Sequence, residues 1–203
     1  MLKVFFYGAI WIIPALILEI IGQIFVKPDL SLFRSLLFFY IVVGPAEELG
    51  KFLAVKRGAR SSKFRIPMDG IILGVSAGLG FATVENIFYI FSAPTPEDQI
   101  LTGIIRAVLS VPGHAFWGAI IGFYVGQSRY NSSTNKIVGL IIAAILHATF
   151  DAANLVISVY AGDSNANNLL GLAVLFGIVY LAYITIIRKE IRTAESESDH
   201  TVP

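Results

Sequence analysis

The 203-residue chain is 56% hydrophobic and only 14% charged, with a mean hydropathy of +0.74. This composition indicates a polytopic membrane protein and excludes an ordinary soluble domain. The formal net charge is +1, so the chain lacks the basic excess typical of nucleic-acid-binding proteins. Cysteine is absent, which excludes disulfides, thiolate nucleophiles and cysteine-ligated metals.

Long apolar segments predict an all-α bundle of about six transmembrane helices in a single domain, residues 1–192. Basic residues follow the second, fourth and sixth segments, so the positive-inside rule predicts that both termini are cytoplasmic. No cleavage site follows the first segment, which we expect to be a retained anchor. The polar tail, residues 193–203, is expected to be disordered. The six segments are approximately residues 2–26, 32–55, 68–91, 100–125, 137–160 and 168–187.

Glycine recurs at every fourth residue in two of these segments, at positions 70, 74 and 78 and at positions 118, 122 and 126. Such stripes of small residues let helix backbones approach closely in a membrane. Helical periodicity places Glu85 almost on the face of the first stripe and His114 on the face of the second. Both side chains are therefore predicted to point into helix–helix interfaces rather than toward lipid.

Ionisable side chains lie inside the predicted spans, where each costs roughly 2.5–3.5 kcal/mol on insertion scales. Hydrogen bonds between polar groups in membranes average only about 0.6 kcal/mol, so purely structural pairing would not offset this cost. These side chains therefore indicate a functional site. In contrast, Glu19 and Gln23, near the outer end of the first span, are expected to form a polar edge at the membrane interface. The polar residues of the later spans are Glu47, Glu48, Lys51, Glu85, Asn86, Arg106, His114, His147, Asp151 and Asn154.

Carboxylates and imidazoles in a partly dry cavity can activate water for hydrolysis. A glutamate can act as general base, a second acid or imidazole can hold the water, and a histidine can stabilise an oxyanion. This combination predicts amide hydrolysis without a covalent intermediate. A zinc alternative stays open, because histidines and carboxylates can form a zinc site with one open position. The candidate metal ligands are Glu47, Glu85, His114 and His147.

Four short motifs occur in order, each in its own predicted span: Glu47-Glu48-x-x-Lys51, Phe81-x-x-x-Glu85-Asn86, His114, and His147-x-x-x-Asp151. Together they resemble the PrsW family of intramembrane proteases, part of the wider group of CAAX-processing and bacteriocin-processing membrane endopeptidases. The resemblance covers the second to fifth spans. The CAAX endopeptidases typically have histidine where this chain has Glu85, so the motifs favour the PrsW branch.

The resemblance implies an intramembrane endopeptidase of glutamic type, with a metalloprotease mechanism as the alternative and no cofactor preferred. Glu47 would be the general base on the attacking water, and His147 would polarise the scissile carbonyl or stabilise its oxyanion. The implied substrate is a membrane-associated protein such as an anti-sigma factor, cleaved at the cell membrane. The other implied catalytic residues are Glu48 beside Glu47, Glu85 on the water or a metal, His114, and Asp151 on His147. Supporting roles are expected for Lys51 near the glutamates and for Phe81, Asn86 and Asn154.

A proton-coupled transporter or channel is the main alternative, because Glu, His and Asp side chains can relay protons through membranes. Transporters commonly contain internal repeats, and no second copy of the motifs is present. Other protease classes fit less well, since the chain lacks His-Glu-x-x-His and Gly-x-Gly-Asp. Gly74-x-Ser76-x-Gly78 spells a serine-hydrolase motif, but it lies in an apolar helical segment rather than at a strand–turn–helix junction.

Overall fold

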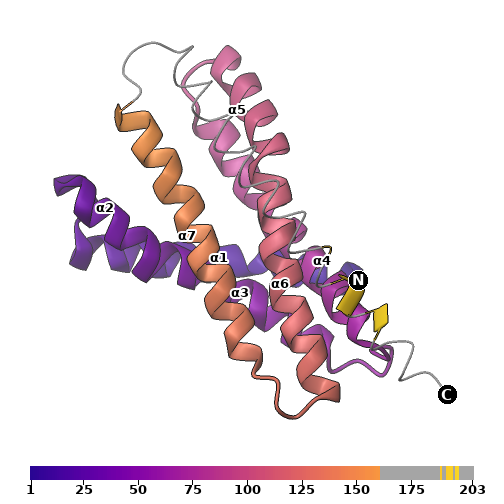
Figure 1. Ribbon diagram of the computed structural model, residues 1–203. Helices are drawn as coiled ribbons and strands as arrows, with labels where there is room; N and C mark the ends of the chain where they lie inside the picture. The colour runs from indigo at the N-terminus through magenta and orange to yellow at the C-terminus, as the bar shows by residue number, and fades with distance from the viewer. Residues whose placement is uncertain (161–187, 189–190, 194, 197–203) are drawn as a thin grey trace.

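The computed structural model describes residues 1–160, together with 188, 191–193 and 195–196. These residues form helices and turns without strands, which confirms the predicted all-α class (Figure 1). The predicted sixth span lies almost entirely outside the described residues, while positions 193, 195 and 196, at the start of the predicted disordered tail, are helical. The elements are α1 (Leu2–Val26), η1 (Pro28–Leu30), α2 (Leu32–Phe38), η2 (Phe39–Val43), α3 (Gly44–Gly58), α4 (Pro67–Ser92), α5 (Pro96–Val108), α6 (Ser110–Tyr130) and α7 (Lys136–Tyr160).

Four helical segments of the described chain are long and apolar enough to cross a membrane. They are α1, α4, the stretch formed by α5 and α6 together, and α7. Each has at least 25 residues, whereas about 20 suffice to cross the hydrocarbon core. The chain is a multi-pass membrane protein, and the total of six spans remains a prediction.

The second predicted span is interrupted by a π-helical turn. Residues 39–43 form η2, in which the backbone N–H of Gly44 bonds to the carbonyl of Phe39, five residues earlier. Pro45 follows at the start of α3 and has no N–H to donate, so a regular α-helical ladder cannot continue through this point. The wider turn changes the direction of the helix just before Glu47. Such π-bulges are frequent at functional sites.

The fourth predicted span is two helices rather than one. α5 ends at Val108 and α6 begins at Ser110, with Leu109 between them at φ −114° and ψ −57°. Pro112 explains the break, because it cannot donate to the carbonyl of Val108 four residues earlier. Figure 1 shows α5 and α6 following one another along nearly one line. The junction lies beside the candidate site described below.

The two glycine stripes meet each other at the interface of α4 and α6. A methyl group added at Gly74 would overlap the backbone carbonyl of Gly118, and one added at Gly118 would overlap the carbonyl of Gly74. The same backbone-to-backbone contact joins Gly70 to Gly122 and Gly78 to His114. The predicted close approach is confirmed, and it brings the helix that carries Glu85 against the helix that carries His114.

Two further helices close the bundle around α4 and α6. α1 crosses α4 with its backbone in contact at Gly8 and Gly80, where an added methyl group would overlap a carbonyl oxygen of the opposite helix. α7 packs on α6 and on α3, and Gly44 approaches the carbonyl of Ala144 at the second of these contacts. The polar side chains of α3, α4, α6 and α7 therefore converge in the interior.

Candidate active site

The first two turns of α3 bring two carboxylates and an ammonium group into the interior. Lys51 Nζ lies 2.5 Å from Glu48 Oε1 and 3.9 Å from Glu47 Oε2. Lys51 and Glu48 have no exposed surface, and Glu47 is only 5% exposed. The closer partner of Lys51 is thus Glu48, three residues before it, rather than Glu47, four residues before it. The ammonium group is also covered by the ring of Phe81, 4.8 Å from its centroid.

His147 on α7 lies between the two adjacent glutamates. Its Nδ1 is 2.8 Å from Glu48 Oε1, within hydrogen-bonding distance, and its Nε2 is 3.7 Å from Glu47 Oε2. Asp151, one turn further along α7, places Oδ2 3.5 Å from the same Nε2. The two nitrogens thus face different groups: Nδ1 faces Glu48, and Nε2 faces Glu47 and Asp151.

His114 on α6 is held by a second carboxylate. Its Nε2 lies 2.8 Å from Glu85 Oε2 of α4, which confirms that both side chains point into the α4–α6 interface. The ring of Phe81 stacks on His114 with centroids 5.7 Å apart. His114 Nδ1 is buried and has no hydrogen-bond partner among the described residues. Each histidine therefore has one nitrogen within 2.8 Å of a carboxylate oxygen, while its other nitrogen makes no contact that close with a carboxylate of the described residues.

Trp117 forms the aromatic wall behind the two histidines. Its indole stacks on His147 with centroids 4.0 Å apart and an angle of 12° between the rings. It also meets His114 edge to face, with centroids 5.1 Å apart. Trp117 has no exposed surface. Because the ring fills the space between α6 and α7, it restricts how far either imidazole can rotate.

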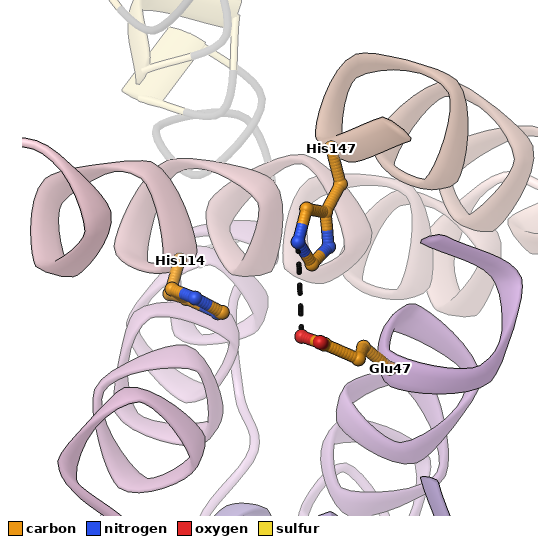
Figure 2. A group of neighbouring side chains, drawn as sticks. All are labelled: Glu47, His114 and His147. Carbon is orange, nitrogen blue, oxygen red and sulfur yellow. Dashed lines mark ion pairs between the residues drawn. The ribbon is translucent and has the colours of Figure 1, made fainter. Parts of the chain in front are cut away.

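Glu47, His114 and His147 come from three different helices and converge on one point (Figure 2). One potential ligand atom from each lies within 4.8 Å of the others. Glu85, a fourth predicted ligand, is not in this group and instead contacts His114. Glu47 Oε2 and His114 Nδ1 are buried without hydrogen-bond partners among the described residues. Buried polar atoms are normally satisfied, so these two fit a bound water molecule or metal ion.

The convergent side chains line a cavity of about 560 Å³. α1 contributes Glu19 and Gln23 to its wall, so these residues belong to the cavity rather than to a separate polar edge. Asp151 and Asn154 line it from α7. Apolar side chains complete the wall, among them Phe38, Phe39, Val43, Ile105, Leu109, Phe150 and Leu155. A cavity of this size and mixed polarity is typical of a site that receives part of a larger molecule.

The structure brings the predicted motifs together around this cavity. Glu47, Glu85, His114, His147 and Asp151 line it directly. Glu48, Lys51 and Phe81 lie behind the wall, where they contact the lining residues. Asn86 accepts a hydrogen bond from Arg106 Nε, at 2.6 Å, and Asn154 Nδ2 donates to the carbonyl of Phe150, at 2.9 Å.

Sequence reasoning missed several residues of the cavity. Trp117 and Tyr89 are aromatic residues in apolar helices, and no spacing distinguishes them from ordinary core residues. Arg106 was named among the polar residues of the spans but was given no role in the site. Glu19 carried the same signal, because a charge inside an apolar segment requires an interior partner. Glu19 was assigned to the membrane interface because the approach of α1 to the site depends on packing that helical periodicity does not reveal.

Fold and site together define a multi-pass helical membrane protein with a buried carboxylate–histidine centre. The chain belongs to the PrsW family, since residues 1–186 match the family described as PrsW family intramembrane metalloprotease. This confirms the family predicted from the four motifs.

Curated relatives of this chain carry the name Protease PrsW. The chain is 31% identical to the protein of Shouchella clausii (strain KSM-K16) over 157 residues, 74% of this chain and 67% of the relative. It is 35% identical to that of Clostridioides difficile (strain 630) over 118 residues, 55% of this chain and 49% of the relative. It is 29% identical to that of Bacillus subtilis (strain 168) over 155 residues, 74% and 67% of the two chains. No solved structure matches the chain.

Proposed function

We propose that the protein hydrolyses peptide bonds of membrane-associated protein substrates at the cavity formed by α1, α2, η2 and α3–α7. The observation that carries the proposal is the convergence of Glu47, His114 and His147 on the wall of a 560 Å³ cavity. Two of their atoms, Glu47 Oε2 and His114 Nδ1, are buried without hydrogen-bond partners among the described residues, and a reacting water could be held there. Membership of a protease family favours hydrolysis over the alternative of ion transport.

Glu47 is the proposed general base. Glu47 lines the cavity, and its Oε2 is buried 3.7 Å from His147 Nε2, so a water molecule between these atoms would contact both side chains. As the water oxygen attacks the carbonyl carbon, Glu47 accepts its proton and then delivers it to the nitrogen of the departing amine when the C–N bond breaks. Asp151 and His147 bound the same space and are proposed to orient the water and the carbonyl oxygen.

The donor set also fits a divalent metal ion. Carboxylates at His147 Nδ1 and at His114 Nε2 favour protons on those nitrogens, which would leave lone pairs on His147 Nε2 and His114 Nδ1. Glu47, His114 and His147 would hold an ion such as zinc, which would supply polarisation of a water molecule or a carbonyl group. With or without the ion, Glu48 and Glu85 fix the orientation of the two imidazoles.

The substrate is proposed to be a protein anchored in or associated with the membrane, because the site is enclosed by helices long enough to span it. An anti-sigma factor with a membrane anchor is a substrate of this kind, and the PrsW resemblance supports it. The polar wall from Glu19, Gln23 and Asn154 can accept the backbone of an unwound segment, whose amide groups require hydrogen-bond partners in a membrane.

The test is a comparison of new protein N-termini in host membranes that carry wild type, Glu47→Gln or Glu97→Gln, with and without envelope stress. Glu97 is an exposed carboxylate in the first turn of α5 and serves as the matched control. We expect a set of termini that appears with wild type and Glu97→Gln and is absent with Glu47→Gln. Identical termini in all three membranes under every stress would overturn the proposal, and ion flux in liposomes would then test the transporter alternative.

A further inference from the structure

Arg106 of α5 is the centre of a polar network at the edge of the cavity. Its Nη2 lies 3.0 Å from Glu85 Oε2, and the same group donates to Ser110 Oγ at 3.0 Å. Its Nε donates to Asn86 Oδ1 at 2.6 Å. The guanidinium plane covers the ring of Tyr89, 3.8 Å from its centroid. All of these partners belong to α4 or to the first residue of α6.

The network reaches His114 through a single oxygen atom. Glu85 Oε2 contacts Arg106 Nη2 at 3.0 Å and His114 Nε2 at 2.8 Å, so the carboxylate is shared between the guanidinium and the imidazole. The Glu85 side chain is 13% exposed and that of Arg106 is 16% exposed, which places the pair away from bulk water. In such surroundings the Glu85 carboxylate, if Arg106 were removed, would reorient toward other polar groups and would no longer be held against His114.

The same arginine spans the break between α5 and α6. Arg106 lies three residues before Leu109, and its bond to Ser110 crosses the point where the α-helical ladder is interrupted by Pro112. α5 has no buried residues of its own, so little apolar packing fixes its position. The guanidinium group therefore provides a polar connection between this helix and α4 beside the cavity.

We propose that Arg106 is a positioning residue for the hydrolytic reaction and that it acts through Glu85 on His114. It holds the Glu85 carboxylate against His114 Nε2, which leaves Nδ1 of that ring for the water or ion of the site. This inference rests on the proposed function. Arg106 itself does not contact the reacting atoms. A lysine cannot reproduce the role in full, because a single ammonium group cannot contact Glu85, Asn86 and Ser110 in the fixed geometry of the guanidinium fork.

The kinetic test uses purified full-length protein with a substrate identified from the N-terminal comparison. We expect Arg106→Gln to lower kcat by about 10–100-fold, the usual loss when a residue that orients a ligand is removed, with KM changed less than about twofold. Arg106→Lys should retain part of the rate. Arg34→Gln, which changes an exposed arginine of α2, is the matched control and should behave as wild type.

A double-mutant cycle separates action through Glu85 from a general loss of structure. In the Glu85→Gln background, Arg106→Gln should lower kcat by less than about twofold further, because the group it positions has already been changed. Equal losses in both backgrounds would overturn the proposal. So would a rise in KM without a fall in kcat, which would assign Arg106 to substrate binding instead.

A measurement independent of activity uses the small number of histidines. The chain has three, so imidazole 15N spectra of histidine-labelled protein in detergent should contain three sets of signals, with His200 as internal reference. Arg106→Gln should shift the signals of His114, assigned with His114→Gln, more than those of His147. Unchanged His114 signals in a folded Arg106→Gln or Arg106→Lys protein would overturn the proposal. The two proposals can also fail separately. If Glu47→Gln cleaves normally but Arg106→Gln still shifts the His114 signals, the proposed function is wrong, while the contact through which Arg106 positions His114 is supported.

Discussion

His147 Nδ1 lies 2.8 Å from Glu48 Oε1, and the same oxygen is 2.5 Å from the ammonium group of Lys51. Glu48 thus connects an imidazole at the cavity wall to a fully buried cation behind it. A buried charge that loses its partner is strongly destabilising, whereas removal of both partners of a pair can be nearly neutral. This relationship allows the structural and catalytic effects of one carboxylate to be separated.

Glu48→Gln should reduce both stability and proteolysis, because it leaves Lys51 with only the more distant Glu47. Loss of a buried partner typically costs about 3–5 kcal/mol. The double variant Glu48→Gln/Lys51→Met should regain much of the thermal stability, measured by unfolding in detergent, and still cleave poorly because His147 lacks its carboxylate. Recovery of wild-type cleavage in the double variant would contradict a role for Glu48 in orienting His147.

Trp117→Leu should lower cleavage more than Trp117→Phe does, although both remove part of the same core. The phenyl ring keeps an aromatic face for His147, while leucine leaves a cavity and removes the ring that stacks on His147. Truncation of a buried aromatic residue costs about 3–5 kcal/mol, so unfolding must be measured beside activity. Equal activity of the two variants at equal folded fraction would argue that the ring stacking has no catalytic consequence.

Gly118→Ala should weaken the α4–α6 interface, because its methyl group would meet the backbone carbonyl of Gly74. The helices must then separate, which would pull Glu85 away from His114. Gly103→Ala is the matched control, since among the described residues a methyl group there would meet only the side chain of Ile90, at 3.5 Å. We expect a loss of cleavage and a lower unfolding temperature for the first variant only. Normal behaviour of Gly118→Ala would show that the interface can relax without disturbing the site.

The donor set predicts retention of a divalent metal ion that depends on three residues. Protein purified without chelator should contain close to one equivalent of zinc, measured by elemental analysis, and His114→Gln or His147→Gln should bind it more weakly. Glu97→Gln should retain the wild-type content. The wild-type protein could instead cleave its substrate at full rate after exhaustive chelation, with no metal found. That result would support a mechanism in which Glu47 activates the water without a metal ion.

The absence of cysteine offers a direct test of water in the cavity. Gln23→Cys lies on the cavity wall and should react with a charged thiol reagent, after which the attached group should block cleavage. Ile10→Cys, on an exposed apolar face of the same helix, should react poorly because lipid would cover it. Labelling is followed by the mass of the intact protein. If both positions react at equal rates, the assignment of cavity and lipid-facing surfaces on α1 is wrong.

The sequence predicted the parts of the site that helical periodicity controls. Glycine stripes with Glu85 and His114 on their faces predicted that both side chains point into helix–helix interfaces, but not that they contact each other. The position of His147 between Glu47 and Glu48 was not predictable, since it depends on how α7 leans across α3. Arg106 and Glu19 were visible as intramembrane charges, but their partners lie on helices whose approach is set by tertiary packing.

The π-helical turn at residues 39–43 makes the register of the second segment sensitive to a single residue. A π-turn amounts to one residue inserted into an α-helix, so deletion of one residue there would restore the regular ladder. The chain before it would then rotate by about 100° relative to α3, as the helical repeat requires. Phe38 and Phe39 would leave the cavity wall while Glu47 kept its place. The number of residues in the π-helical turn thus determines which side chains of the cavity wall would contact a substrate, without moving Glu47.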